Sequence, residues 1–197
     1  MIVAALGGEG GGVLTTWLLD VAKRSGWHCQ STSLAGVAQR TGATIYYLEF
    51  IPRSSHQPVP VMSLFPAQGD IDLAVTSEIA EAGRMISRGF VSPERTTLIS
   101  SDHRVYGITE KSDTTDGTAD TAFILNLSTR YANRFVHFDM LELVQRHGTV
   151  ISAGLFGAIA GAEVLPFHRE TYTQILDSGK GAVANRAAFD ESFERAQ

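Results

Sequence analysis

The sequence has 197 residues, 44% of them hydrophobic and 19% charged, which is ordinary for a soluble globular protein built as one α/β domain. A net charge of −5 and a pI near 5.6 argue against nucleic acid as a main partner. The longest apolar stretch, residues 150–162, is too short and too rich in glycine to cross a bilayer, and no signal peptide is recognisable. We therefore expect a cytoplasmic protein without a membrane partner.

The predicted elements begin with a short apolar strand at residues 2–6, followed by six residues, GGEGGG, which we call the glycine loop (residues 7–12). A helix is expected at residues 13–23, ended by Gly26, and a second strand at residues 27–33. The side chains expected to face inward from this helix are Val13, Trp17, Leu18, Val21 and Ala22. This order predicts the opening of a doubly wound α/β sheet.

The glycine loop does not carry a nucleotide-binding fingerprint. Val13 stands both at the last glycine of G-x-G-x-x-G and at the lysine of a phosphate loop. No acidic residue lies between Asp20 and Glu49 to hold a ribose. What remains is a helix N-terminus whose free N–H groups favour an anion, opposed by the carboxylate of Glu9. The alternative is a loop that packs closely on a neighbouring backbone.

A second glycine-bracketed segment precedes a strand expected at residues 43–51, which is rich in β-branched and aromatic residues. We call GVAQRTG, residues 36–42, the arginine turn. Its two glycines allow the backbone to turn tightly and present Gln39, Arg40 and Thr41 together. The alternative is an ordinary surface turn with a solvated arginine.

The rest of the chain alternates short apolar runs with amphipathic segments. Strands are expected at residues 59–64 (an edge strand in a proline-rich loop), 71–76, 96–101, 104–108 and 135–138. Helices are expected at residues 78–88, 119–133, 140–146, 151–162, 167–177 and 182–196, and a polar loop at residues 110–117. In the helix at 78–88 the solvated face is expected to carry Glu81, Arg84 and Arg88.

The helix at residues 151–162 has Gly154, Gly157 and Gly161 on one face, where another backbone could approach closely. This face could pack on the sheet within the domain or form a subunit contact, which leaves a homodimer of the isolated chain open.

The histidines have no metal-ligand spacing, and no nucleophile elbow is present. The one cysteine, Cys29, excludes an internal disulfide and cannot hold an iron–sulfur cluster alone; we expect a buried thiol rather than a nucleophile.

Four segments resemble, in this order, the gamma component of the 2-oxoacid (pyruvate, ketoisovalerate, indolepyruvate) ferredoxin oxidoreductases, with the indolepyruvate beta subunit as the closest match. They are LGGEGGG at residues 6–12, GVAQRTGATIYYLE at 36–49, DIDLAVTSEIAEAGR at 70–84 and GKGAVANRAAF at 179–189. The family loop usually reads G-x-G-G-Q-G. Here Ala5 stands for its first glycine and Glu9 for its glutamine.

The resemblance implies a Rossmann-like domain over residues 1–197, with a mainly parallel sheet and helices on both faces. The domain would be either the first part of a longer beta chain or a short stand-alone form. It implies no catalytic residue and no cofactor held by this chain alone. An alpha subunit would bear thiamine diphosphate, Mg²⁺ and iron–sulfur clusters, ferredoxin would accept electrons, and coenzyme A would take the acyl group.

In this family the gamma component is associated with coenzyme A binding and with assembly of the complex. The residues that the resemblance assigns to coenzyme A are Gly7, Gly8, Gly10 and Gly11 of the glycine loop and Gly36, Gln39, Arg40 and Thr41 of the arginine turn. Arg40 would contact phosphate. Two other functions stay open: a bracing subunit without a small-molecule site, and a free-standing nucleotide-dependent oxidoreductase, which the failed fingerprint disfavours.

Overall fold

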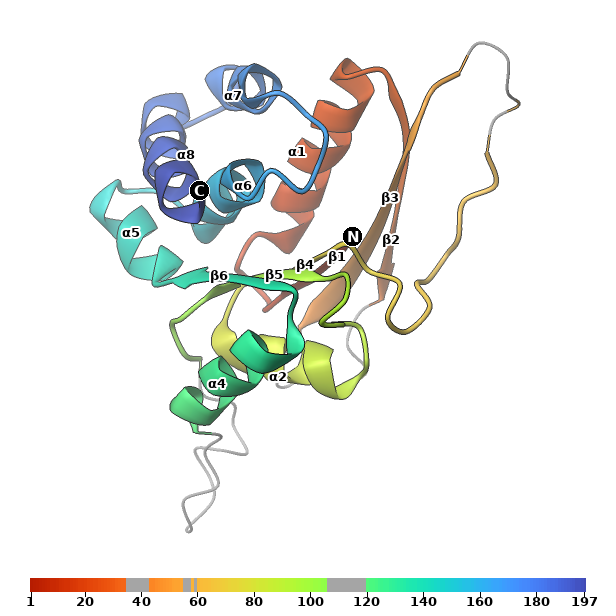
Figure 1. Ribbon diagram of the computed structural model, residues 1–197. Coiled ribbons are helices and arrows are strands. Elements are labelled where there is room, and N and C mark those ends of the chain that lie inside the picture. The colour runs from red at the N-terminus through yellow and green to blue at the C-terminus, as the bar shows by residue number, and fades with distance from the viewer. Residues whose placement is uncertain (35–42, 55–57, 59, 106–119) are drawn as a thin grey trace.

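The computed structural model describes residues 1–34, 43–54, 58, 60–105 and 120–197. Within these ranges the chain forms a six-stranded sheet with the order β2-β3-β1-β4-β5-β6 (Figure 1). The strands are β1 (Ile2–Ala5), β2 (Trp27–Leu34), β3 (Thr44–Pro52), β4 (Leu73–Thr76), β5 (Thr97–Ser101) and β6 (Arg134–Phe138). The pairs β1–β4, β4–β5 and β5–β6 are parallel, whereas β3 runs antiparallel to both β1 and β2.

This topology confirms the predicted α/β fold, with one difference in strand order. The predicted opening would follow a doubly wound sheet, but β3 lies between β1 and β2. The segment that joins β2 to β3 covers only residues 35–43. A parallel crossover needs a dozen or more residues, so two strands joined by so short a segment pair antiparallel.

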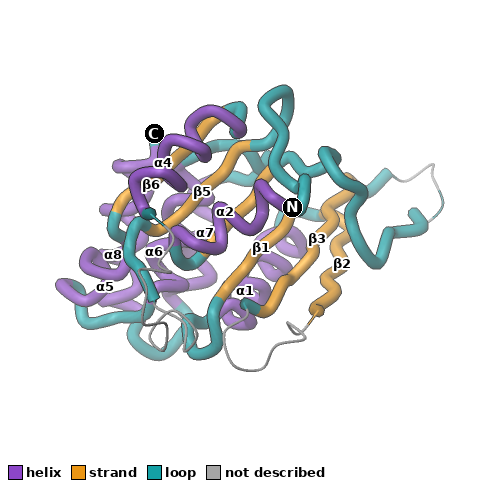
Figure 2. Tube along the Cα trace, turned by 90° about the horizontal axis from the view of Figure 1, so that it is seen from below, coloured by secondary structure: helices purple, strands orange, loops and turns teal. Residues whose placement is uncertain are grey.

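Helices cover both faces of the sheet (Figures 1 and 2). One face carries α1 (Gly11–Arg24), α5 (Met140–Arg146), α6 (Ile151–Gly161), α7 (Arg169–Asp177) and α8 (Ala182–Ala196). The other carries α2 (Ile79–Ser87) and α4 (Thr121–Tyr131). Each layer encloses its own hydrophobic core, and both cores draw on the fully buried β1, β4 and β5. None of the helices in the described ranges is long and apolar enough to cross a membrane.

Two predicted helix faces are wrong in detail. In α1 the predicted inward residues Leu18, Val21 and Ala22 are buried. At the start of the helix, however, the side chain of Val13 is 46% exposed and Leu14 is fully buried in its place. In α2 the predicted solvated residue Glu81 is only 3% exposed. Arg84, one turn further along, reaches back to its carboxylate. The prediction that Gly26 ends the first helix is confirmed by its left-handed φ of 77°.

The glycine face of α6 packs within the domain, on α8 rather than on the sheet. A Cβ on Gly157 would collide with the backbone carbonyl of Phe189, and one on Gly161 with the carbonyl of Phe193. Gly154 faces Val144 instead, whose methyl would lie 3.0 Å from such a Cβ. These glycines therefore let two helix backbones approach, and this face is used inside the fold.

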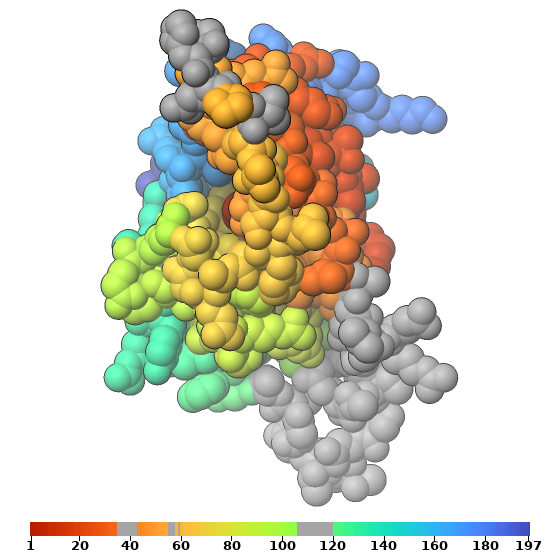
Figure 3. Space-filling view, turned by 90° about the vertical axis from the view of Figure 1, so that its right-hand side faces the viewer, coloured from red at the N-terminus to blue at the C-terminus, as the bar shows by residue number. Residues whose placement is uncertain are grey.

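The predicted edge strand at residues 59–64 is wrong for the described residues 60–64, which are neither helix nor strand. Side chains hold this segment on the β2–β3 hairpin: Gln30 donates to the Ser63 carbonyl at 3.0 Å and Thr32 to the Leu64 carbonyl at 2.7 Å. We call residues 60–65 the strap; Figure 3 shows it in yellow across the orange strands. Pro60, which has no N–H, cannot donate to the hydrogen-bond ladder of a sheet.

Of the strand predicted at residues 104–108, residues 104 and 105 are not strand. Residues 106–108 and the predicted loop at residues 110–117 lie outside the described residues.

Candidate functional site

The carboxyl ends of β1 and β4 form the point at which the chain leaves the sheet toward opposite faces. The two strands are parallel neighbours, with Ala4 paired to Thr76. The chain continues from β1 into α1 on one face and from β4 into α2 on the other. In open α/β sheets, ligands bind in the crevice at such a switch point. Here the loops that meet are residues 6–10 and 77–78.

The glycine loop has two glycines that packing requires. Gly10 has φ of 70° and caps α1, and a Cβ there would collide with the Ser152 hydroxyl, which donates to the Gly10 carbonyl at 3.1 Å. A Cβ on Gly11 would lie 2.6 Å from the Ala5 Cβ and 2.7 Å from the Tyr46 ring. The alternative of close packing on neighbouring groups therefore accounts for Gly10 and Gly11.

The other two predicted glycines face open space. Gly7 and Gly8 are exposed, and no atom of the described residues lies within 4 Å of the position that a Cβ would take on either of them. Gly8 also has a left-handed φ of 89°. A ligand could reach the loop backbone at these two residues without moving a side chain.

Glu9 is fixed at the crevice by two side chains from the neighbouring strand ends. Its Oε1 lies 3.0 Å from Nε2 of His103, and its Oε2 accepts a hydrogen bond from the Ser77 hydroxyl. The Ser77 oxygen in turn accepts the Leu6 N–H at 3.1 Å. Burial alone would raise the pKa of Glu9, but the hydrogen bonds from His103 and Ser77 outweigh it and hold the pKa below its usual value.

The hydrogen-bond network favours one tautomer of His103. Ser101 Oγ accepts the Met140 N–H at 3.0 Å and lies 2.8 Å from His103 Nδ1. The single Ser101 proton can therefore be donated to Nδ1, which leaves the ring proton on Nε2, facing Glu9. Every member of the network is then satisfied, and it joins the ends of β1, β4 and β5.

The side chains of Ser101, His103 and Glu9 contact one another in the order serine, histidine, carboxylate, as in the catalytic triad of a hydrolase. Unlike the serine of such a triad, however, Ser101 is not accessible to a substrate. The Ser101 side chain is fully buried, and its oxygen already accepts a backbone N–H. A nucleophile must reach the substrate carbonyl, which Ser101 cannot do. The arrangement therefore fixes the glycine loop and does not support hydrolysis at Ser101.

A second charged pair lies beside this network. Glu78 caps α2 by accepting the Ala80 N–H at 3.2 Å, and its carboxylate also lies 3.3 Å from the Arg104 guanidinium. The two side chains are 1% and 9% exposed. Glu78 directly follows Ser77 and Arg104 directly follows His103 in the chain, so this buried ion pair lies next to the network of Glu9.

The four predicted residues of the arginine turn, Gly36, Gln39, Arg40 and Thr41, lie outside the described residues. Their flanking strand residues are described. Thr44 pairs with Ala5, the last residue of β1, and Leu34 pairs with Ile45. The two ends from which the arginine turn departs therefore lie at the same edge of the sheet as the glycine loop.

Sequence reasoning missed Ser77, Ser101 and His103. Ser77 directly follows β4, Ser101 ends β5 and His103 lies two residues after β5, and polar residues at the ends of buried parallel strands were the available signal. Cys29, expected to be buried, is only partly so and donates to the Leu19 carbonyl at 3.6 Å. The described residues hold no group of three or more His, Cys, Asp or Glu side chains suited to a metal ion.

Comparison with known proteins gives one family match. The family is described as pyruvate ferredoxin/flavodoxin oxidoreductase, and the match covers residues 1–195. A comparison with curated proteins finds no match.

Several solved structures are similar in fold. The gamma subunit of keto/oxoacid ferredoxin oxidoreductase from Geobacter sulfurreducens PCA is 16% identical with a TM-score of 0.64, covering 99% of this chain and 96% of that one. The pyruvate oxidoreductase subunit PORC from Thermotoga maritima is 14% identical with a TM-score of 0.61, covering 98% and 95%. The 2-oxoglutarate:ferredoxin oxidoreductase from Magnetococcus marinus, solved with 2-oxoglutarate, coenzyme A and succinyl-CoA bound, is 12% identical with a TM-score of 0.63, covering 99% of this chain and 30% of that one. At these identities the likeness concerns the fold.

Proposed function

The chain belongs to the pyruvate ferredoxin/flavodoxin oxidoreductase family, and on that premise we propose that it is the gamma component of a 2-oxoacid:ferredoxin oxidoreductase complex. Two proteins of similar fold and nearly equal extent are described as a gamma subunit and as subunit PORC of such enzymes. Their similar length supports the proposal that a domain of this size can be a separate subunit of such a complex. Residues 1–197 would form one gamma-type domain, either free-standing or at the start of a longer beta chain.

In this proposal the chain contributes to coenzyme A binding and to assembly, and carries no redox centre. An alpha subunit would bear thiamine diphosphate, Mg²⁺ and iron–sulfur clusters, which supply decarboxylation and electron transfer to ferredoxin. The single cysteine of this chain is too few to ligate a cluster. Indolepyruvate or another arylpyruvate is the substrate that we propose, on the sequence resemblance alone.

One observation carries the coenzyme A assignment: the pairing of Ala5 with Thr44. It joins the strand end that leads into the glycine loop to the strand that emerges from the arginine turn. Arg40 would bind the pyrophosphate of coenzyme A through its planar guanidinium, and Gln39 and Thr41 would add hydrogen bonds. The open backbone at Gly7 and Gly8 would complete the site.

Glu9 would have an orienting role in such a site. Its carboxylate repels phosphate at short range, but Ser77 and His103 hold both of its oxygens toward the ends of β4 and β5. The bound phosphate would therefore lie on the arginine-turn side of the loop. Glu9 would also limit how close any anion comes to the crevice between β1 and β4.

The second candidate is a bracing subunit of the same complex that binds no small molecule. Two carboxylates at the switch point, Glu9 and Glu78, favour this role, because negatively charged carboxylates repel a phosphate. The glycine face of α6 gives this role no support, because α8 covers Gly157 and Gly161.

Titration with coenzyme A, of the isolated chain and of the complex co-purified with its partner chain, separates the two candidates. The proposal expects calorimetric binding of coenzyme A that is strongest in the complex, together with turnover of a 2-oxoacid. A complex that oxidises the 2-oxoacid normally but whose coenzyme A affinity is the same with and without this chain would favour the bracing role. Failure to co-purify with any thiamine-dependent chain would overturn both.

A further inference from the structure

We propose that a groove at the outer edge of the sheet, remote from the glycine loop, binds a phosphate-bearing small molecule. The groove has a volume of about 420 Å³ and is lined by Lys23, Trp27, His28, Cys29, Gln30, Arg53, Pro60 and Met62. We call it the basic groove. It lies where β2 begins at Trp27, whereas the glycine loop lies near the opposite end of the β2–β3 pair. The proposal is therefore independent of the proposed coenzyme A site.

The first argument is charge. Lys23 comes from the last turn of α1, and Arg53 directly follows β3, so two separate elements bring cations to one groove. Among the described residues, none that lines it is acidic, although the whole chain carries a net charge of −5. Asp20 lies 3.5 Å from the Lys23 ammonium, in a pair that is open to solvent. Such pairs are weak, so an incoming phosphate can compete with Asp20 for Lys23.

The Cys29 thiol, which also lines the groove, lies within electrostatic reach of both cations. Burial raises the pKa of this thiol, and the positive charges of Lys23 and Arg53 both act to lower it, whereas the negative charge of Asp20 acts to raise it. Both cations are therefore close enough to act on one atom in the wall of the groove. A phosphate dianion in the groove would therefore meet two positive charges.

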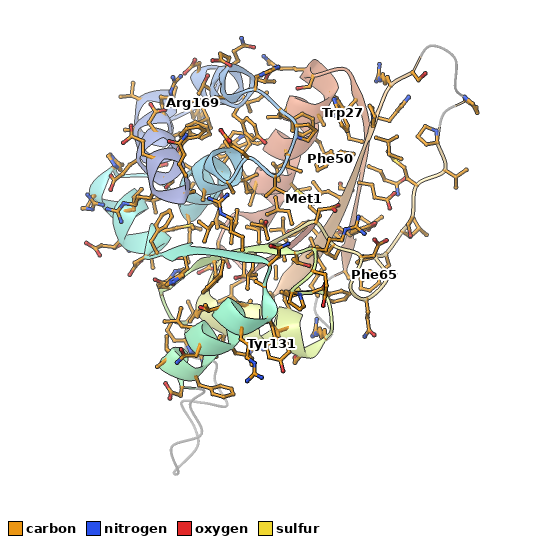
Figure 4. All side chains as sticks on the ribbon, in the orientation of Figure 1. Met1, Trp27, Phe50, Phe65, Tyr131 and Arg169 are labelled. Carbon is orange, nitrogen blue, oxygen red and sulfur yellow. The ribbon has the colours of Figure 1, made fainter. Side chains whose placement is uncertain are left out.

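The second argument is the shape of the remaining wall. Trp27, Pro60 and Met62 provide an apolar surface beside the cations. The Trp27 ring is held edge-on by Phe167 at a centroid distance of 5.4 Å, and Figure 4 shows Trp27 at the far end of the hairpin from Phe65. Gln30 ties the strap over the groove through the Ser63 carbonyl. A rigid aromatic wall next to a cationic one suits a phosphate or diphosphate ester with a flat apolar body, and the volume is in the usual range for a small ligand.

Tryptophan fluorescence can test the proposal, because the chain has only two tryptophans and one of them lines the groove. In a Trp17→Phe background Trp27 is the sole reporter. Inorganic pyrophosphate is expected to change its emission in a saturable way. The variant Lys23→Gln/Arg53→Gln should weaken that binding by about ten-fold or more, the loss expected for hydrogen bonds to charged groups.

The matched control is Arg88→Gln/Lys180→Gln, which removes the same charge from two exposed positions that do not line the groove. It should leave the affinity for pyrophosphate unchanged. Calorimetry on the same samples detects pyrophosphate binding even if that binding does not alter the fluorescence of Trp27. Equal losses in the two double variants would mean general charge attraction and would overturn the proposal, as would absence of saturable binding by both methods.

Coenzyme A carries the same phosphate chemistry and is the second ligand to titrate. If it binds in the basic groove, Lys23→Gln/Arg53→Gln weakens it and Arg40→Ala does not. If it binds at the proposed site near the glycine loop, the pattern is reversed, while pyrophosphate still reports on the basic groove. The two proposals can thus fail separately.

Discussion

The carboxylate of Glu9 lies 3.0 Å from the imidazole Nε2 of His103, a contact between residues 94 positions apart in the chain. Through Ser77 the same carboxylate also contacts the end of β4. One side chain of the glycine loop therefore joins the ends of three parallel strands, β1, β4 and β5. These contacts fix the loop at the switch point and place the negative charge of Glu9 there.

We expect the variant Glu9→Gln to remove part of the acid sensitivity of the fold. The folded-state pKa of Glu9 is lowered, below the unfolded value of about 4.3. Its stabilising contribution is thus complete above that value and is lost as the pH falls through the folded pKa. At pH 7 the variant should lose about 1–2 kcal/mol of unfolding free energy, because the amide NH₂ replaces one carboxylate oxygen and cannot accept the hydrogen bond that His103 or Ser77 donates to that atom. Urea unfolding between pH 3 and about pH 7 measures both effects.

The control for this prediction is Glu194→Gln, which changes an exposed carboxylate at the end of α8. It should leave the pH dependence of stability as it is in the unaltered chain. A Glu9→Gln protein with an unchanged slope between pH 3 and about pH 5 would mean that the contact with His103 contributes nothing to stability.

Glu81 should behave in the opposite way. Burial raises its pKa, although Arg84 opposes the shift, so the charged form is disfavoured in the folded state. The stability that this group contributes therefore increases as the pH falls through its folded pKa, and above that pH its charge is destabilising. We expect Glu81→Gln to keep the unfolding free energy at pH 7 within about 1 kcal/mol or to raise it. A loss of more than about 2 kcal/mol in urea unfolding would show that the ion pair with Arg84 outweighs the burial of the charge.

Replacement of Gly157 by alanine should destabilise the packing of α6 on α8. The new Cβ would lie 2.9 Å from the Cα of Phe189 and closer still to its carbonyl oxygen, both of which are backbone atoms that cannot rotate away. Overpacking typically costs about 1–3 kcal/mol, and the gain of about 1 kcal/mol in helix propensity offsets only part of a backbone collision. We expect a net loss of about 2 kcal/mol in urea unfolding.

Gly83→Ala is the matched control, since Gly83 also lies inside a helix. A Cβ there would meet methyl groups of Ile124 at 3.5–3.8 Å, which is ordinary contact. This variant should be neutral or slightly stabilising. If both alanine variants lost the same stability, the close approach of α6 and α8 would not be the cause.

The sequence could predict elements whose signal is local. The apolar runs of β1 and β6 and the helix from Met140 to Arg146 were found because burial imposes a periodicity within a few residues. In α1 the prediction was wrong for Val13, since Val13 and Leu14 are equally apolar and only the packing on the sheet decides between them. The position of β3 between β1 and β2 depends on strand pairing, which no local pattern carries.

The sequence predicted the position of the loop at the candidate site but not the side-chain contacts that the loop makes. Two glycines in succession after a strand indicated the loop, but nothing near Glu9 in sequence points to Ser77 or His103. Those contacts exist because parallel strands bring their carboxyl ends to one edge, and the order of strands at that edge becomes known only with the fold. Gly10 and Gly11 looked like ligand residues, although neighbouring side chains explain them.

Arg40 is the residue on which the coenzyme A proposal depends most. It is the only lysine or arginine between Arg24 and Arg53. If its guanidinium binds a phosphate of coenzyme A, Arg40→Ala should weaken coenzyme A binding by about 1.5–3 kcal/mol, or roughly ten- to a hundred-fold in affinity. Arg40→Lys should restore only part of this, because lysine keeps the charge but lacks the planar fork.

The measurement is the steady-state rate of the assembled enzyme at varied coenzyme A, together with its size-exclusion profile. Assembly and the decarboxylating half-reaction should both survive in Arg40→Ala, since neither needs this phosphate contact. Arg24→Ala, at the exposed end of α1, is the matched control and should leave the KM for coenzyme A unchanged. If Arg40→Ala instead dissociates the complex while the KM for coenzyme A stays the same, Arg40 contacts the partner chain, and the bracing role becomes the better account of this subunit.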